Sequence, residues 1–302
     1  MKALLSVSLF YLLIILLTAY IVIDWPANAQ QKALASTSSN SRSSILQNNI
    51  TQQIITRNNI EAKLLAKYLQ NTLNSSGSIL EILSSHPDIR SLQFVNSINS
   101  DFHGIPENVD LAKRSVADTI LSKYKYFGRI FFLLPNGNVY LIEPFSGQQN
   151  LTVNNLSFRD YYKGALATNN IFLGGESISL TSHHKTAVIS VPIYSSSGKL
   201  SEIWGGALEL SVFDKSLQAL NLSQISQRVV YVDQHGNKTA DSNQSTSNYS
   251  ESFANLDSFK NAMEGKAGSM MEFVNNVKTI ISYQPVKFAS TTWVVLLMQP
   301  YQ

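Results

Sequence analysis

The chain has 302 residues, enough for about two domains, and 44% of them are hydrophobic, so the sequence can bury a core. Charged residues make up only 14%, and the net charge of +3 comes from scattered Lys and Arg without a run of like charges, which argues against a nucleic-acid-binding surface. The lack of Cys excludes disulfides, thiol catalysis and thiolate metal sites.

The N-terminal sequence predicts export. Lys2 precedes an uncharged, apolar run from Ala3 to Ile23, and roughly twenty apolar residues suffice to span a bilayer. Ala27 and Ala29 form the small-x-small pattern of a signal-peptidase site, so residues 1–29 are interpreted as a signal peptide or an N-terminal membrane anchor. The apolar core of a signal peptide is usually about 7–15 residues long, and the longer run favours an anchor. We expect the body of the protein to lie outside the cytoplasm, on the cell membrane or secreted if the segment is cleaved.

A long helix is predicted after a short spacer. Residues 30–44 are rich in Ser, Thr and Asn and show no hydrophobic period, as in a spacer. Apolar residues recur at helical spacing from Ile45 to Leu73, which predicts a helix roughly 40 Å long. The sequence from Asn74 to Gly77 is expected to break it, and a second helix is expected from Ile79 to the stop at His86-Pro87. Residues 45–84 thus hold the stalk helix and the start of a second helix.

Residues 85–220 are predicted to form a first module. Its first sheet element is a hairpin around the turn sequence Pro135-Asn136-Gly137-Asn138. We interpret the strands as one antiparallel meander with helices on one face, an α+β arrangement. The expected elements are a helix from about Leu111 to Tyr126 and strands at Gly128–Leu134, Val139–Glu143, Ile178–Leu180, Thr186–Tyr194 and Ile203–Val212.

Residues 221–302 repeat the order of strand, Gly turn, helix and strands, and so predict a second module. A second sheet, packed like the first along the long helix, is therefore expected. The expected elements are a strand at Val229–Asp233, a turn at His235-Gly236, a helix near Leu256–Met263, and strands at Ser269–Val274, Val277–Val286 and Thr292–Met298.

One helical segment of the first module concentrates a cation and aromatic side chains. Arg159 offers a forked guanidinium for a carboxylate, and Tyr161 and Tyr162 offer flat, hydroxyl-tipped walls. These are residue types of a binding site. The alternative is that Arg159 forms a salt bridge with Asp160 or Glu209 and that the tyrosines serve only for packing.

The sequence Arg159-Asp160-Tyr161-Tyr162 resembles the Arg-x-aromatic-Tyr segment of double Cache (dCache) sensor domains, the extracytoplasmic ligand-binding modules of chemoreceptors and sensor kinases. The order of strands and turns also matches from about Ile45 to Pro300. The resemblance implies a long N-terminal stalk helix followed by two PAS-like modules, each an antiparallel sheet with flanking helices. It also implies that Arg159 binds a ligand carboxylate and that the neighbouring aromatics shape the pocket.

Two positions depart from the amino-acid-binding members of that family. The resemblance implies that an acidic residue on a later strand holds the amine of the ligand, and this chain has Glu209 where those members usually have Asp. They also have a Tyr five residues before the Arg, where this chain has Asn154. Amines, carboxylates and ureas therefore stand beside amino acids as candidate ligands.

We predict a non-enzymatic sensor domain that binds a small organic ligand, such as an amino acid, amine or carboxylate, and takes part in signal transduction or chemotaxis. Residues 85–220 would be the membrane-distal, ligand-binding module and residues 221–302 the membrane-proximal one. The predicted ligand-binding residues are Arg159, Tyr161, Tyr162, Glu209 and Tyr140.

A second hypothesis remains open. Because no second apolar run and no signalling domain follow in this sequence, the chain is alternatively an accessory or interaction protein that binds no ligand. It would pair with a separate membrane receptor, or with a second copy of itself, through the stalk helix.

Catalytic and cofactor sites are not indicated by the sequence. His183 and His184 would point to opposite faces of a strand and so would not bind one metal ion. The Asp-x-His pairs at Asp101 and Asp233 lack a Gly-x-Ser-x-Gly nucleophile elbow, and the glycines lack the spacing of a phosphate-binding loop. We expect no catalytic residue, no cofactor and no metal ion.

Overall fold

The computed structural model describes residues 39–195, 197–220, 222, 226–245 and 250–301. Residues 53–302 form one compact unit, and the packing contacts described below lie within it. The predicted signal peptide or anchor, residues 1–29, lies outside the described residues, as does the predicted spacer up to residue 38. In the described part of the chain, no helix combines the length and the apolar character that crossing a membrane requires.

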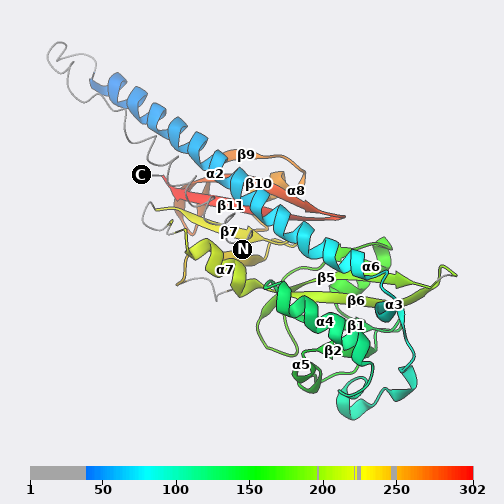
Figure 1. Ribbon diagram of the computed structural model, residues 1–302. Coiled ribbons are helices and arrows are strands. Elements are labelled where there is room, and N and C mark those ends of the chain that lie inside the picture. The colour runs from blue at the N-terminus through cyan, green and yellow to red at the C-terminus, as the bar shows by residue number, and fades with distance from the viewer. Residues whose placement is uncertain (1–38, 196, 221, 223–225, 246–249, 302) are drawn as a thin grey trace. The chain divides into compact units, whose positions relative to one another are not determined.

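One long helix, α2, runs from Ser39 to Leu83 (Figure 1). The last residues of the predicted spacer are therefore helical. The predicted break from Asn74 to Gly77 and the separate second helix are wrong, because Ser76 and Gly77 are buried and tertiary packing outweighs the low helix propensity of Gly. A Cβ atom at Gly77 would lie 2.6 Å from the Phe288 ring and 3.0 Å from Ile171, so glycine permits a close approach here.

The first sheet has six antiparallel strands in the order β2-β1-β6-β5-β3, and β4 pairs with β5 as well. Its strands are β1 (Phe127–Leu133), β2 (Val139–Glu143), β3 (Phe172–Leu173), β4 (Ser177–Ile178), β5 (Lys185–Tyr194) and β6 (Leu200–Glu209). The helices of this region are α3 (Pro87–Arg90), α4 (Leu111–Lys123), α5 (Phe145–Gln149), α6 (Asp160–Thr168) and α7 (Leu210–Gln218), with 3-10 turns at Val95–Ser97 and Ser100–Phe102. The predicted strand Ile203–Val212 is too long, because α7 begins directly after Glu209.

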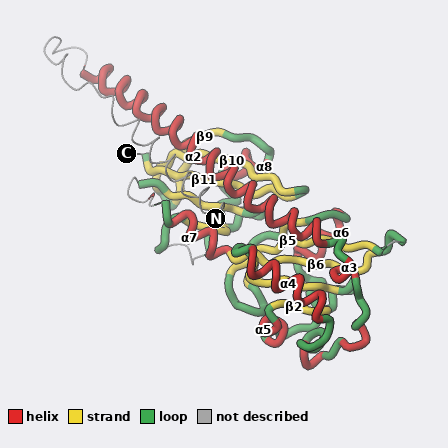
Figure 2. The backbone as a smooth tube through the Cα atoms, viewed as in Figure 1, coloured by secondary structure: helices red, strands yellow, loops and turns green. Residues whose placement is uncertain are grey.

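The second sheet has five antiparallel strands in the order β8-β7-β11-β10-β9, and the two sheets form separate groups of strands (Figure 2). Its elements are β7 (Arg228–Val232), β8 (Lys238–Asp241), α8 (Asp257–Met263), β9 (Gly268–Val274), β10 (Val277–Phe288) and β11 (Thr291–Pro300). In both sheets the opening hairpin pairs with the last strand of the sheet. This shared order confirms the predicted repeat of two modules, although β8 was not predicted.

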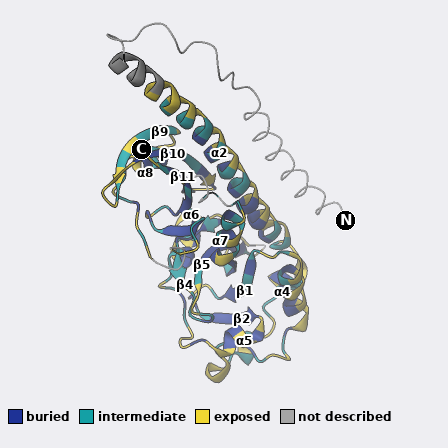
Figure 3. Cartoon of the chain, turned by 90° about the vertical axis from the view of Figure 1, so that its left-hand side faces the viewer, coloured by how far each residue is buried: buried dark blue, intermediate teal, exposed yellow. Residues whose placement is uncertain are grey.

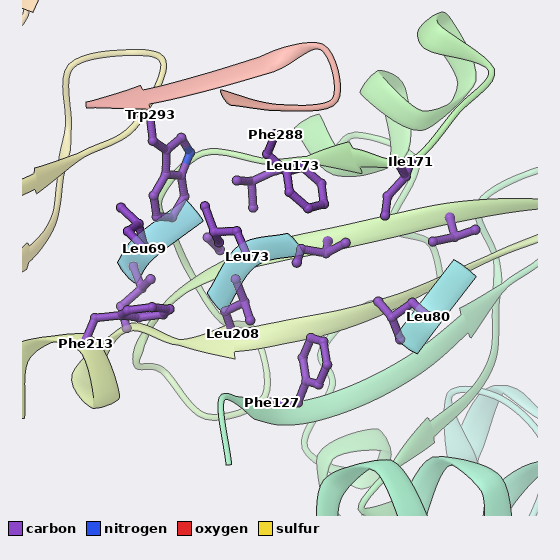
Figure 4. Packing of buried hydrophobic residues seen from close by; sticks show 14 of the residues in the cluster. Leu69, Leu73, Leu80, Phe127, Ile171, Leu173, Leu208, Phe213, Phe288 and Trp293 are labelled. Atoms are coloured by element: carbon purple, nitrogen blue, oxygen red, sulfur yellow. The ribbon is translucent and has the colours of Figure 1, made fainter. Parts of the chain in front are cut away.

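The helix α2 and both sheets share one hydrophobic core. Figure 4 shows Leu69, Leu73 and Leu80 of α2 among side chains of both modules, such as Leu208 from β6 and Trp293 from β11. All five side chains are at most 1% exposed. In Figure 3 the strands β1 and β2 are dark blue, and α2 alternates between buried and exposed residues, as an amphipathic helix does.

Helices cover both faces of the sheets, so the prediction of helices on one face is wrong. Ala165 of α6 and Phe131 of β1 belong to a second core on the face of the first sheet away from α2. Phe259 of α8 and Val294 of β11 belong to a third core on the corresponding face of the second sheet. Alternate residues of a strand point to opposite faces, and in the central strands nearly every residue is buried, as a sheet covered on both faces requires.

An ion pair is buried where α4 packs on the first sheet. Lys113 Nζ donates to Glu202 Oε2 at 2.9 Å and to Oε1 at 3.1 Å, and both side chains are 0% exposed. The same Nζ lies 4.7 Å from the centroid of the Phe132 ring. Burial lowers the pKa of Lys113 and raises the pKa of Glu202 to about 7, and the attraction within the pair opposes both shifts. The attraction within the pair therefore offsets only part of the free energy that desolvation of the two charges costs.

Replacing Gly77 by Ala tests the close approach of α2. Overpacking against Phe288 should cost about 1–3 kcal/mol, which exceeds the gain of about 1 kcal/mol from the higher helix propensity of Ala. We expect Gly77→Ala to lower the free energy of unfolding in urea. The exposed neighbour Ser78 is the control, since Ser78→Ala should leave stability unchanged or raise it slightly. A stability gain in Gly77→Ala would contradict the packing account.

Replacing one partner of the buried ion pair should lower the stability of the fold more than replacing both partners. Lys113→Met leaves the Glu202 carboxyl group buried without a partner and should cost about 3–5 kcal/mol of unfolding free energy. The double variant Lys113→Met, Glu202→Met replaces both groups by apolar side chains and should be close to wild type. Equal losses in the single and double variants, measured by urea unfolding at pH 7, would show that the two groups do not act as a pair.

Candidate functional site

A cavity lies between the first sheet and α6, on the face of the sheet that α2 does not cover. Its floor includes Phe131, Val188 and Ala207, which come from β1, β5 and β6. The cavity volume is about 50 Å³. A buried water needs roughly 10–15 Å³ of such volume, so the space admits about three to five waters or a ligand of few atoms. The lining residues are Arg129, Phe131, Ile142, Leu151, Leu156, Arg159, Tyr161, Ser177, Ile178, Ser179, Leu180, Thr181, Thr186, Val188 and Ala207.

Arg159 lines this cavity from the residue directly before α6. Its backbone is extended, with φ −69° and ψ 145°, and its side chain is half-buried. Nη2 donates to the carbonyl of Ile178 at 3.0 Å, and Cζ lies 5.3 Å from the centroid of the Phe158 ring. Among the described residues Arg159 forms no ion pair, so the predicted alternative of a salt bridge to Asp160 or Glu209 is not formed. Its charge is therefore available to a ligand.

The two tyrosines that follow have different surroundings, since successive residues of a helix point about 100° apart. Tyr161 lines the cavity and packs on Phe131 with ring centroids 5.3 Å apart. Burial raises the pKa of Tyr161, and its hydroxyl has no hydrogen-bond partner in the described part of the chain. Tyr162 instead donates its hydroxyl to the carbonyl of Pro135 at 2.7 Å. Tyr162 therefore anchors α6 to the hairpin turn rather than lining the cavity.

Glu209 lies at the end of β6, directly opposite Thr186 of β5. Its side chain covers Gly128, where an added Cβ atom would lie 2.0 Å from Oε1. Thr186 lines the cavity, whereas Glu209 is outside the lining residues. Glu209 thus borders the site without forming its wall.

Tyr140 lies on the opposite face of the sheet, in the core shared with α2 and α4. Its hydroxyl donates to Asp110 Oδ2 at 2.7 Å, and it is 0% exposed. Simple alternation would place Tyr140 on the same face as the cavity residue Ile142. The register shifts between Phe132 and Leu133, and this bulge leaves Tyr140 as the extra residue, which turns it to the other face. The structure therefore brings together Arg159 and Tyr161 and separates them from Tyr140.

Arg129 of β1 was missed by the sequence analysis and lines the cavity. Its Nη1 donates to the carbonyl of Gly128 at 2.6 Å, and its Nε is buried without a partner among the described residues. Gly147 of α5 lies against this atom, since an added Cβ there would be 2.6 Å from Nε. The only signal in the sequence is a single cation in an otherwise apolar strand, Phe127–Leu133.

Residues 175–181, which include the short strand β4, form the roof of the cavity and are held at three points. The Asp160 carboxylate accepts from the backbone N–H of Gly175 at 2.7 Å and from that of Tyr161 at 2.7 Å. Arg159 donates to the carbonyl of Ile178, as described above. On the other side, the N–H of Glu176 donates to Asp233 Oδ2 at 2.7 Å, and Asp233 follows strand β7 of the second module. The roof therefore contacts both α6 and the second module.

No group of three or more side chains that could bind a metal ion was found in the part of the chain that the structure describes.

Comparison with solved structures finds the same fold in bacterial receptors. The ligand-binding domain of the Pseudomonas fluorescens chemoreceptor CtaA, solved with L-isoleucine, has a TM-score of 0.60 at 16% identity, over 84% of this chain and 95% of that chain. The ligand-binding domain of the Pseudomonas aeruginosa PAO1 amino acid chemoreceptor PctB, solved with L-Gln, has a TM-score of 0.58 at 16% identity, over 79% of this chain and 88% of that chain. The periplasmic sensory domain of the Campylobacter jejuni chemoreceptor Tlp1 has a TM-score of 0.60 at 12% identity, over 83% of this chain and 96% of that chain.

At these identities the likeness shows the fold and not the ligand. A comparison with curated protein sequences gave no match. A family model described as "Cache domain" matches residues 43–302, which is most of the chain. The resemblance stated from the sequence is confirmed: the chain belongs to the dCache_1 family of Cache domains, extracytoplasmic sensor domains of membrane receptors that bind small ligands and are not catalytic.

Proposed function

We propose that the first module, residues 85–220, binds a small organic ligand such as an amino acid, amine or carboxylate in the cavity beneath α6. The single observation that supports this most strongly is the position of Arg159, a half-buried cation without an ion-pair partner among the described residues, on the wall of a cavity with apolar sides. Binding sites of small ligands are typically apolar with a few polar groups that orient the ligand. Arg159 would hold a carboxylate and Tyr161 would form a wall.

The same proposal includes signal transduction. A ligand that accepts hydrogen bonds from Arg159 binds the same side chain that holds the carbonyl of Ile178, and the ligand is therefore coupled to the roof through Arg159. The roof is bonded in turn to Asp233 of the second module through the N–H of Glu176. We propose the second module, residues 221–302, as the membrane-proximal part and residues 1–29 as the membrane anchor or signal peptide. The domain would then take part in signalling or chemotaxis at the cell surface.

A second candidate function is supported by the surface of α2. Ile60 and Leu64 lie one helical turn apart and are 49% and 43% exposed. Exposed apolar residues at this spacing are suited to packing against a second helix. The chain would then pair, as a homodimer or with a separate receptor, through the stalk helix.

The test of the first proposal is ligand binding. A thermal-shift screen with amino acids, amines and short carboxylates should find a compound that raises the melting temperature, because a ligand of the folded state stabilises it. Calorimetry should then show that Arg159→Ala weakens binding by about 2–5 kcal/mol, a loss of roughly thirtyfold or more. Arg159→Lys should restore little, since an ammonium group cannot form two parallel hydrogen bonds to a carboxylate.

The neighbouring tyrosines provide a matched control for this experiment. Tyr161→Ala should weaken binding because it removes a wall of the cavity, whereas Tyr162→Phe removes only the hydroxyl that bonds Pro135 and should leave affinity unchanged. Unchanged affinity in Arg159→Ala, with a native circular dichroism spectrum, would place the ligand elsewhere.

The helix-pairing candidate predicts self-association that depends on α2. The double variant Ile60→Glu, Leu64→Glu should be monomeric in sedimentation experiments in which the wild type is a dimer. The reason is that pairing would bury the two negative charges of each helix without counterions. Leu111→Glu, on the exposed start of α4, is the control, since Leu111 is 64% exposed and lies on another helix. A wild type that remains monomeric at all concentrations would contradict homodimer formation through α2.

A further inference from the structure

The charged side chains that line the cavity are all positive. Arg129 and Arg159 are its only titratable lining residues apart from Tyr161, and no Asp or Glu belongs to the lining within the described residues. Two carboxylates close to the lining residues are accounted for in other ways. Asp160 accepts two backbone N–H groups, from Tyr161 and Gly175. Glu209 lies over Gly128, outside the lining.

Both arginines have donors to spare. A guanidinium carries five N–H donors and no acceptor. Arg159 gives one of them to the carbonyl of Ile178, and Arg129 gives one to the carbonyl of Gly128. Neither forms an ion pair with a described residue. Buried donors without acceptors cost free energy, and an anion in the cavity would supply the acceptors.

The same cavity would disfavour a ligand that carries an ammonium group. In the cavity it would stand near two fixed positive charges, out of bulk water and without a carboxylate to pair with. Like charges disfavour the charged form of a group, and partial burial strengthens that effect. The apolar lining, which includes Phe131, Leu156 and Val188, is suited to hydrocarbon instead.

We infer that the ligand of this cavity is a short aliphatic carboxylate without an amino group, and that Arg129 is a second anchor for it beside Arg159. The inference rests on the proposed function of the cavity and narrows it to one chemical class. The volume of about 50 Å³ limits the ligand to a few non-hydrogen atoms. Arg129 determines specificity because it adds positive charge to the wall that faces the ligand.

Two pairs of compounds test this inference on the full chain by calorimetry. Propionate and L-alanine share one carbon skeleton, as do acetate and glycine, and the members of each pair differ by the ammonium group. In at least one pair the acid without an amine should bind at least tenfold more tightly, which corresponds to about 1.4 kcal/mol. Equal or tighter binding of the amino member in both pairs would overturn the inference and leave the proposed ligand-binding function intact. If none of the four compounds binds, and no other compound of the thermal-shift screen does, both fail.

A variant separates the role of Arg129 from a structural one. Arg129→Gln keeps a polar side chain and removes the charge, so it should weaken the binding of the preferred acid at least tenfold and also reduce the preference over its amino partner. A purely structural defect would weaken both members of a pair equally. Arg90→Gln removes a charge from an exposed position of α3 and should change neither value. Wild-type affinity and wild-type preference in Arg129→Gln would exclude Arg129 as an anchor.

Discussion

The packing of α2 against both sheets is the contact on which the rest of the structure depends. Each sheet has a face of large apolar side chains, and residues 53–83 of α2 bury part of both faces in a single core. Small residues at Ala62, Ala66 and Gly77 let the helix approach closely, and Leu69, Leu73 and Leu80 fill the space between. Because both sheets bury apolar side chains against the same stretch of α2, neither module has a core that is independent of the helix.

This arrangement divides the first sheet into two faces with different chemistry. On the face toward α2 and α4, the cations Lys113 and Arg114 are buried and paired with Glu202 and Glu143. On the face toward α6, Arg129 and Arg159 remain without such partners among the described residues. Even a half-buried charge without a counterion costs free energy, and folding alone gives no reason to keep two of them at one cavity. This contrast between the faces supports the proposal that the ligand binds on the α6 side.

Much of the fold could be predicted from the sequence because the strands are rich in β-branched and aromatic residues and are separated by Gly and Asn turns. The continuity of α2 could not, because it depends on contacts between Gly77 and residues such as Phe288 that are remote in the sequence. The position of Tyr140 on the other face could not be predicted either, because the sequence does not reveal the bulge in the hairpin. Arg159 and Tyr161 were recognised as a local motif, whereas Arg129 belongs to no motif and is brought to the cavity only by the pairing of β1 with β6.

The hydrogen bonds from α2 to β11 have a consequence for how the chain folds. Asn58 donates to the side chain of Gln299, 241 residues further along the sequence. A chain that emerges N-terminus first at about 5–20 residues per second therefore exposes the apolar stripe of α2 for tens of seconds before its last partner strand exists. During that interval the stripe is a surface for aggregation or for a chaperone, and closing so long a loop makes the final docking step slow. The stability of this sensor domain is thus completed only by its last strand.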